Sequence, residues 1–288
     1  MNNKANSSAV IERINSEYYN LTAAEKKAAD FIAANSIRAQ HMSISEMAKE
    51  AAVAEATISR FSRRLGYKSF NDLKLSIAAE AAEGREQSPL SGDVSEGESF
   101  SQVCRKICAT DIKAITDTMK LIDESKIKSA VDLIEKAAVV ICMGQGGSMI
   151  LAEEAAHLFT TVESKYFAIS DSHTQAITAS TMNEKGLIMY FSYSGATIDA
   201  IQTLRLARER GVKIILITKF PNAPATEYAD VVLQCGSNES LLQLGSAPAK
   251  IAQIFLMDVL FSELCMRNLT ACRDTRKQIA DVLAEKHI

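Results

Sequence analysis

Five short apolar segments, separated by longer amphipathic ones, constrain the second half of this chain more than any other feature. The apolar segments cover residues 139–143, 166–169, 187–191, 214–218 and 231–234. The main helical patterns around them cover residues 100–121, 126–136, 149–162, 175–183, 197–210 and 247–266. Strands that alternate with helices form parallel sheets with helices on both faces. We therefore expect an α/β domain in which a five-stranded parallel sheet lies between helix layers.

Two loops that follow predicted strands carry candidate binding residues. Residues 144–148 read GQGGS, residues 192–197 read SYSGAT, and each loop leads into a helix. Ligands bind parallel sheets beyond the carboxyl ends of the strands, and helix N-termini there favour anions. The pattern indicates a phosphate site built from hydroxyl and backbone N–H groups, without a base or a metal. A dinucleotide site is disfavoured because position 149 is Met instead of a third glycine, and no acid closes the second strand.

The first 80 residues predict a cluster of short helices. Two capping boxes, Thr22 with Glu25 and Ser43 with Glu46, each predict the start of a helix. A tight turn over residues 52–54 then leads into a helix over residues 55–65. Two short helices joined in this way form a helix-turn-helix pattern, whose second helix enters the major groove of DNA.

The second helix of this pattern has a basic outer face. Ile58, Phe61 and Leu65 form its apolar stripe, while residues 56–74 carry five basic residues and one acidic residue. Small hydroxyl side chains can approach base edges, and guanidinium groups reach phosphates or guanine. The candidate DNA contacts are Thr57, Ser59, Arg60, Arg63, Arg64 and Lys68. A solvated basic helix in an all-α packing domain is the alternative on charge and spacing alone.

A polar segment separates the two halves. Residues 81–100 are rich in Gly and Ser and carry five acids against one base, which predicts an exposed hinge. We expect a helix-turn-helix domain over residues 1–80, this hinge, and a ligand-binding domain over residues 101–288. The first 80 residues carry 11 Lys and Arg against nine Asp and Glu, a net charge of +2, although the whole chain has −3. A small, mildly basic head thus precedes a larger acidic body.

Composition also indicates the compartment. No apolar run approaches the roughly 18–20 residues of a membrane span, and the first 20 residues contain no apolar signal segment. The six cysteines form no C-x-x-C pair, and no nearby His completes a metal set. We expect a cytoplasmic protein with reduced thiols, no metal and no membrane partner.

The motifs together resemble a known family. Residues 144–148 and the segment FSYSGAT at 191–197 resemble the signature of a sugar isomerase (SIS) domain. The segments LTAAEKKAADFI at 21–32, SISEMA at 43–48 and ATISRFSRRLGY at 56–67 resemble the helix-turn-helix of RpiR-family bacterial transcription regulators. The resemblance and its domain order span nearly the whole chain. It implies that a phosphosugar bound to the SIS domain changes how a dimer holds operator DNA.

The resemblance also implies which residues bind the ligand. Phosphate contacts would come from the glycine and hydroxyl loops, namely Gly146, Gly147, Ser148, Ser192, Ser194 and Thr197. His173, Glu239 and Lys250 would contact the sugar or its phosphate, with Lys250 standing where many members have Arg. A helix-capping or surface Glu239 and a solvated Lys250 are the alternatives.

The turn of the head departs from the family pattern. Many members have Gly and Ser at the positions of Ala52 and Ala54, where glycine adopts a left-handed conformation and serine caps the second helix. Each alanine should cost about 1 kcal/mol. Glu55, at the start of the second helix, is also unfavourable for phosphates, although it could accept from a cytosine amino group.

We expect a non-enzymatic regulator, a repressor of sugar catabolism genes that acts as a homodimer or a dimer of dimers. Its effector is a sugar phosphate, and the polar residues do not choose among the ribose, hexose, acetylamino-sugar and ketodeoxy-gluconate phosphates to which relatives respond. An N-acetylated amino-sugar 6-phosphate is a guess within this set. One alternative is a SIS-fold isomerase, which needs a base near the sugar, such as Glu153, Glu154, His157 or His173. The other is a phosphosugar-binding regulator of a protein partner. The basic head favours the DNA-binding regulator.

Overall fold

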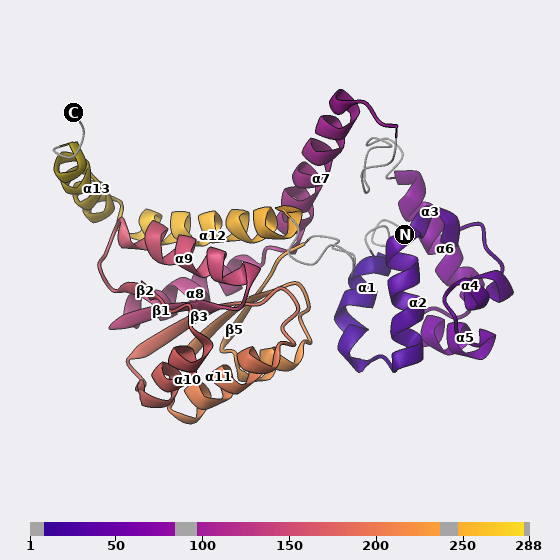
Figure 1. The fold of residues 1–288 in the computed structure, drawn as a ribbon, viewed down its shortest axis with the longest axis horizontal. Helices are drawn as coiled ribbons and strands as arrows, with labels where there is room; N and C mark the ends of the chain where they lie inside the picture. Colours follow the sequence, from indigo (N-terminus) through magenta and orange to yellow (C-terminus); the bar gives the residue numbers. More distant parts are fainter. Residues whose placement is uncertain (1–8, 84–96, 237–246, 285–288) are drawn as a thin grey trace. The chain divides into compact units, whose positions relative to one another are not determined.

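The computed structural model describes residues 9–83, 97–236 and 247–284, which form two compact units (Figure 1). The predicted hinge over residues 81–100 falls mainly on residues 84–96, outside the described residues. The first unit, the head, contains α1 (Ala9–Glu17), α2 (Ala23–Ala34), α3 (Ser36–Ala39), α4 (Ile44–Glu50), α5 (Glu55–Arg64) and α6 (Phe70–Glu83). The division between the units falls within α7 (Phe100–Leu121).

The body contains the alternating strands and helices that the sequence predicts. Its elements are α8 (Glu124–Lys136), β1 (Val139–Gly144), α9 (Gly147–Thr160), β2 (Tyr166–Ala168), α10 (Ser172–Thr181), β3 (Gly186–Phe191), α11 (Ile198–Glu209), β4 (Lys213–Thr218), β5 (Val231–Gln234), α12 (Ala247–Arg267) and α13 (Leu269–Ala284). All five predicted strands are confirmed, with bounds shifted by one residue at most. The predicted α/β class is therefore correct.

The sheet is parallel throughout, in the order β2-β1-β3-β4-β5. The chain passes from β1 to β2 on one side and then to β3 on the other, so the strand order reverses between β1 and β3. In open α/β sheets a ligand binds at such a switch point, beyond the carboxyl ends of the strands.

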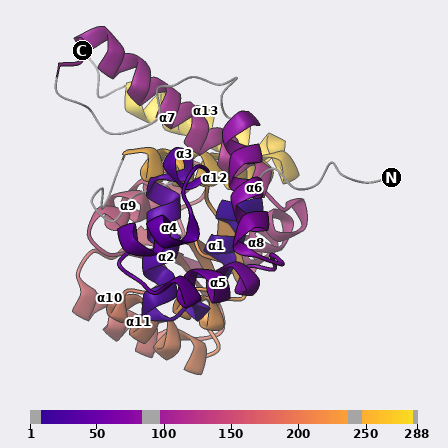
Figure 2. The ribbon, with the colours of Figure 1, turned by 90° about the vertical axis from the view of Figure 1, so that its right-hand side faces the viewer.

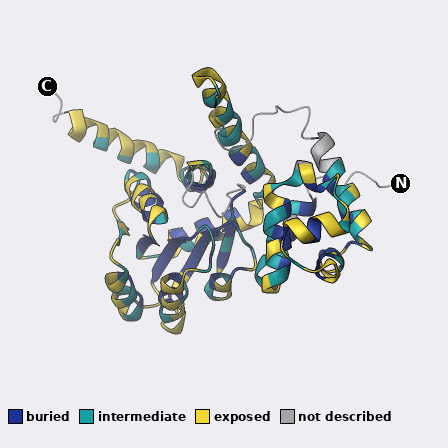
Figure 3. Ribbon diagram, turned by 45° about the vertical axis from the view of Figure 1, so that its right-hand side comes forward, coloured by how far each residue is buried: buried dark blue, intermediate teal, exposed yellow. Residues whose placement is uncertain are grey.

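Both faces of the sheet are buried (Figure 3). Apolar side chains of α8, α9 and α12 form one cluster against the sheet, and those of α10 and α11 form another on the opposite face. Strands covered on both faces need continuous apolar runs, which explains why segments such as LIMYF at residues 187–191 identified them in the sequence. The last turns of α7 join the first cluster through the buried Ala114.

The helices of the head, of which α2, α4 and α5 are labelled in Figure 2, pack around an apolar core of their own. Ile32 of α2, Met47 of α4, and Ile58 and Phe61 of α5 are completely buried. Both predicted capping boxes are formed, so α2 and α4 begin where the sequence indicates. The stripe of α5 therefore faces the core, as predicted, and its basic side chains point elsewhere.

Within the described ranges, no helix combines the length and apolar character that a membrane span requires. All six cysteines are described and none forms a disulfide; Cys142 and Cys235 are buried, whereas Cys104 and Cys108 are exposed on α7.

Candidate functional site

The two predicted loops lie side by side at the switch point. Gly144 at the end of β1 pairs in register with Phe191 at the end of β3. The glycine loop (residues 144–148) and the hydroxyl loop (residues 192–197) therefore start from adjacent positions on one edge of the sheet. This is the edge at which parallel sheets bind ligands.

The glycine loop turns too tightly for larger residues. A Cβ at Gly144 would lie 2.7 Å from the backbone oxygen of Ser148. Gly146 has φ of +54°, in the left-handed region that favours glycine. A Cβ at Gly147 would lie 3.4 Å from Cε of Lys250, so the first turn of α12 brings this lysine beside the loop. Lys250 thus lies close to a loop that precedes it by about 100 residues in the sequence.

The hydroxyl loop is a compact turn that leads into α11. Oγ of Ser192 accepts a hydrogen bond from the Gly195 N–H at 3.1 Å, and Oγ of Ser194 accepts from the Ala196 N–H at 3.3 Å. A serine hydroxyl that accepts a hydrogen bond also carries a proton that it can donate. Gly195 has φ of +60°, and a Cβ there would lie 2.5 Å from the side chain of Ala223. Glycine is therefore required at this point of the turn.

The helices that follow the two loops differ from their neighbours at their N-termini. Asp123 caps α8 and Asp171 caps α10 through side-chain hydrogen bonds, and the backbone N–H of Thr174 is the main cause of the lowered pKa of Asp171. Among the described residues, no side chain caps α9, which starts after Gly146, or α11, which starts after Thr197. At α9 the N–H groups of Ser148 and Met149 donate to the backbone oxygens of Gln145 and Gly146, both at 3.0 Å. The helix dipole at both N-termini still favours an anion. Asp199 in the first turn of α11 partly offsets that preference.

A buried amide connects the glycine loop to the next helix. The side-chain nitrogen of Gln175 donates to the backbone oxygens of Gly144 at 3.0 Å and Ile169 at 2.7 Å, and its oxygen accepts from Gln145 at 2.9 Å. Gln175 is completely buried, so these bonds are formed out of water. This residue, which we did not single out in the sequence, fixes the glycine loop relative to α10 and its exposed His173.

The other predicted ligand residues are placed as follows. His173 is exposed in the first turn of α10, beyond the end of β2 and two residues before Gln175, which contacts the glycine loop. Ser148 lies in the first turn of α9, and Thr197 is the residue before α11. Glu239 lies outside the described residues. Glu153, Glu154 and His157, the candidate bases of an isomerase, are exposed along α9 beyond its first turn.

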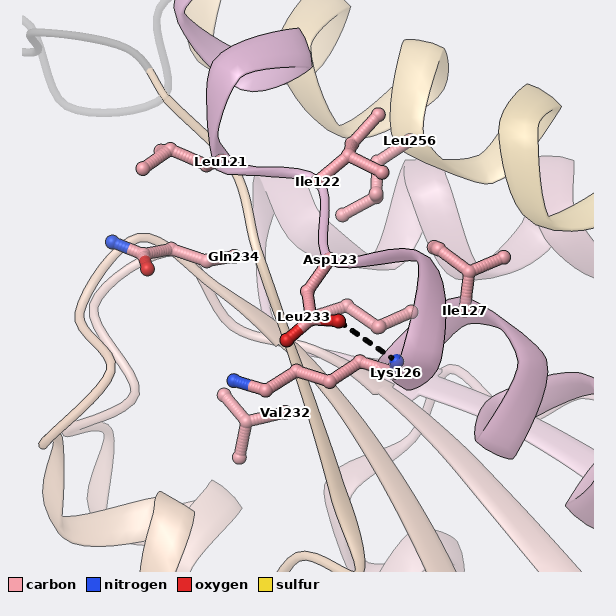
Figure 4. Close-up of a pocket in the computed structure, with 9 residues that line it drawn as sticks. All are labelled: Leu121, Ile122, Asp123, Lys126, Ile127, Val232, Leu233, Gln234 and Leu256. Atoms are coloured by element: carbon pink, nitrogen blue, oxygen red, sulfur yellow. Dashed lines mark hydrogen bonds between the residues drawn. The ribbon is translucent and has the colours of Figure 1, made fainter.

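A small hollow in the body lies away from these loops (Figure 4). It is lined by Leu121, Ile122, Asp123, Lys126, Ile127, Val232, Leu233, Gln234 and Leu256, beside the outer strand β5. The carboxylate of Asp123 faces the start of α8, where it accepts from the backbone N–H groups of Ser125 and Lys126. The carboxylate of Asp123 therefore caps α8, and the switch point remains the candidate ligand site.

The candidate DNA-binding surface lies on α4, the turn after it, and α5. Ala52 has φ of +52°, so the left-handed residue that the family pattern places here is indeed in that conformation, although it is not glycine. Ala54 is the N-cap of α5, with the extended backbone typical of a cap but no side-chain oxygen. The helix pair therefore forms despite both substitutions.

The candidate DNA contacts differ in how accessible they are. Arg60, Arg63 and Lys68 are exposed, and Ser59 is half-buried. Thr57 is only 7% exposed, so its hydroxyl faces the head rather than the open side of α5. Arg64 is already engaged, since its guanidinium donates to the backbone oxygen of Asn20 at 2.8 Å and to Glu25 at 2.9 Å.

Among the described residues, no group of three or more His, Cys, Asp or Glu side chains could hold a metal ion. The described residues at the switch point supply hydroxyl groups, backbone N–H groups and the ammonium of Lys250.

Both halves of the chain match known protein families. The helix-turn-helix domain of the rpiR family matches residues 8–84, and the SIS domain matches residues 133–263. An uncharacterised HTH-type transcriptional regulator of Clostridium perfringens is 32% identical over 88% of this chain and 91% of its own length. A second one, from Haemophilus influenzae, is 28% identical over 99% of both chains. The structure of the Vibrio vulnificus NanR protein complexed with ManNAc-6P has a TM-score of 0.63, with 23% identity over 96% of this chain and 99% of that one.

Proposed function

Because this chain belongs to the rpiR family of helix-turn-helix transcription regulators with a SIS domain, we propose that it represses sugar catabolism genes until a phosphosugar binds to its body. We keep the division into a DNA-binding head over residues 1–80, a hinge over 81–100 and a sensor body over 101–288. A protein that acts on operator DNA in a bacterium works in the cytoplasm.

One observation carries the ligand proposal. The N-termini of α9 and α11 start beside each other at the switch point and, within the described residues, are the helix ends without a side-chain cap on that edge, in contrast to α10. Hydroxyls of the loop over residues 192–197 and the ammonium of Lys250 lie around them. Such an arrangement suits a phosphate monoester, which carries nearly two negative charges near pH 7.

The sugar class is proposed from the neighbour with bound ligand. NanR of Vibrio vulnificus, which shares the fold, was solved with ManNAc-6P, an N-acetylated amino-sugar 6-phosphate. We propose an effector of this class for the present chain. Ligand can change operator affinity only if the two arrangements of the dimer bind it differently, and that difference sets the size of the response.

DNA binding is assigned to the exposed basic side chains around α5. Arg60, Arg63 and Lys68 contact phosphates or base edges, while Arg64 contributes by holding α5 to the segment around Asn20. Ser59 remains the proposed hydroxyl contact, because Thr57 is only 7% exposed. Two heads bind two half-sites of an inverted repeat.

Dimerisation is assigned to apolar surfaces that lie exposed on the helices. Phe100 and Ile107 of α7 are 84% and 54% exposed and lie on the helix stripe that continues to the buried Ala114 and Thr118. The described helix α13 is likewise exposed or half-buried along its whole length. A second copy of the chain covers such faces in a homodimer, and further pairing gives a dimer of dimers.

The alternative function, a sugar isomerase, would require a catalytic base in the site. Aldose–ketose isomerisation requires a base within hydrogen-bond reach of the sugar carbons. His173 lies two residues before Gln175, which contacts the glycine loop, whereas Glu153 and Glu154 lie along α9 beyond its first turn. The head favours a sensor over a catalyst, because an isomerase has no use for a DNA-binding unit.

Substitution of a loop hydroxyl tests this function. Ser194→Ala removes one charge-assisted hydrogen bond to the phosphate, which should weaken phosphosugar binding by about tenfold to a hundredfold and leave DNA binding intact. Ser129→Ala, on the exposed face of α8, is the matched control. Binding of a phosphosugar panel that includes ManNAc-6P is measured by calorimetry. Equal affinities for the two variants would remove the hydroxyl loop from the ligand site.

A further inference from the structure

The hydroxyl loop contains no basic residue, although its proposed ligand is a dianion. Residues 192–197 supply hydroxyls and backbone N–H groups only. Neutral donors orient a phosphate, but a nearby cation adds attraction that grows with the ligand's charge. Lys250 lies beside the glycine loop, across the site from this turn. A cation that lies directly against the hydroxyl loop would supply this attraction.

Lys219 meets that description. It follows β4, the strand next to β3, and its backbone N–H donates to the oxygen of Tyr193, the second residue of the hydroxyl loop, at 3.0 Å. The residue is only 7% exposed. Its ammonium nitrogen lies 5.7 Å from the ring centroid of Tyr193 and 5.2 Å from that of Phe220. The positive charge is thus buried against the loop, which is rare for lysine.

Lys219 lies on the same face of the sheet as the proposed phosphate. Tyr193 packs against the apolar cluster formed with α8, α9 and α12, which also contains Ile217, two residues before Lys219. The helices α9 and α12 on this side carry the glycine loop and Lys250. Lys219 therefore lies on the face of the sheet on which the two loops and α12 meet.

We propose that Lys219 is a binding residue that supplies positive charge to the phosphate held by the hydroxyl loop. This inference rests on the proposed function, and it names the chemical class that the site selects: phosphate monoesters in their dianionic form. Burial strengthens the effect, because the charge acts through protein rather than water. The rings of Tyr193 and Phe220 attract the ammonium group through cation–π interactions.

The test uses the full-length protein and inorganic phosphate as the probe. Lys219→Met and Lys219→Gln remove the charge, and Lys219→Arg keeps it. The control is Lys213→Met, since Lys213 is an exposed lysine at the opposite end of β4 and its partner Asp230 retains Arg208. The phosphate-dependent rise of the body's own unfolding midpoint, followed through hydrogen exchange of body peptides, gives an apparent Kd, with chloride at equal ionic strength as the reference.

We expect the two neutral variants to lose about tenfold to a hundredfold in phosphate affinity, while Lys219→Arg and Lys213→Met stay near the wild type. The preference for dianion over monoanion, measured between about pH 5.5 and about pH 7.5, should also shrink in the neutral variants. A purely structural lysine would lower the midpoint without phosphate and leave that preference unchanged.

The outcomes distinguish the role of Lys219 from the existence of the phosphate site. Wild-type affinity and pH preference in both neutral variants, with Ser194→Ala still defective, would overturn the role of Lys219 and leave the phosphate site standing. If phosphate does not stabilise even the wild type, the hydroxyl loop is not a phosphate site, and both the proposed function and this inference fail.

Discussion

Two alanines in the turn of the helix-turn-helix, Ala52 and Ala54, lower the folding stability of the head, and substitution of each should restore it. Ala52 has φ of +52°, and a residue with a Cβ pays about 1–2 kcal/mol in that conformation. Glycine avoids this cost but loses about 0.5–1 kcal/mol more backbone entropy on folding. Ala52→Gly should therefore stabilise the head by about 0.5–1 kcal/mol. Ala54→Ser adds an oxygen to an N-cap that already has φ of −78° and ψ of 150°, for about 1 kcal/mol more.

Hydrogen exchange read by mass spectrometry measures this change in the head alone. The chain contains no Trp, and a whole-chain unfolding curve would mix the two units. Amides of α2 and α5 that exchange through opening of the head should slow about two- to fivefold in Ala52→Gly and about fivefold in Ala54→Ser. Peptides of the body should be unaffected and serve as the internal reference.

Ala33→Gly is the control of opposite sign. Ala33 is exposed in the last turn of α2, where glycine should cost about 0.5–1 kcal/mol and speed exchange. Both turn alanines are exposed, so no packing is lost by either substitution. Faster exchange in Ala52→Gly, like that in Ala33→Gly, would refute the reasoning about the left-handed turn.

Three further predictions concern DNA binding, acid stability and assembly. Arg60→Ala should weaken operator binding by about 1–3 kcal/mol in an anisotropy titration while head exchange rates stay normal, whereas Arg64→Ala should also speed exchange; equal exchange in both variants would contradict the structural role of Arg64. The pKa of Glu25 is lowered, because bonds from Thr22 and Arg64 outweigh the effect of burial. The stabilisation from Glu25 is therefore complete above about pH 4.5 and lost as the pH falls through the lowered pKa, and Glu25→Gln should flatten the acid limb of the head's exchange profile. Phe100→Asp should raise the dimer dissociation constant in sedimentation runs, and an unchanged value would exclude that part of α7 from the interface.

Two controls apply to these predictions. Salt is held fixed in the DNA titrations, because phosphate contacts make affinity steeply salt-dependent. For assembly, Lys128→Ala on the exposed face of α8 changes surface charge outside the two apolar faces and should leave the dimer constant unchanged.

Local signals in the sequence were sufficient for the five strands and for α2 and α4, whereas α1, α6 and α13 were not predicted. The five strands were identifiable because strands buried on both faces are continuous apolar runs. The two capping boxes marked the starts of α2 and α4, since the bonds involved join residues only three apart. The conformation of Ala52 followed from the family pattern, even though alanine gives no local signal for a positive φ.

Contacts between distant segments were not predictable in this way. Arg64 looked like a free basic side chain, but it pairs with Glu25, 39 residues away, and only the packing of α5 on α2 shows it. Thr57 was assigned to the outer face, yet the phase of α5 buries it beside Ile58. Gln175 and Lys219 belong to no motif that we recognised, and their positions at the switch point depend on which strand ends lie side by side.

Fluorescence anisotropy of the purified protein on DNA from upstream of its own and adjacent genes tests the central claim most directly. The protein is titrated with and without a phosphosugar panel that includes ManNAc-6P, at fixed salt. We predict tight, sequence-selective binding that one phosphosugar weakens. Absence of selective binding on every fragment would contradict the regulator, leave the head as a module for a protein partner, and direct attention to isomerase assays with His173 as the first candidate base.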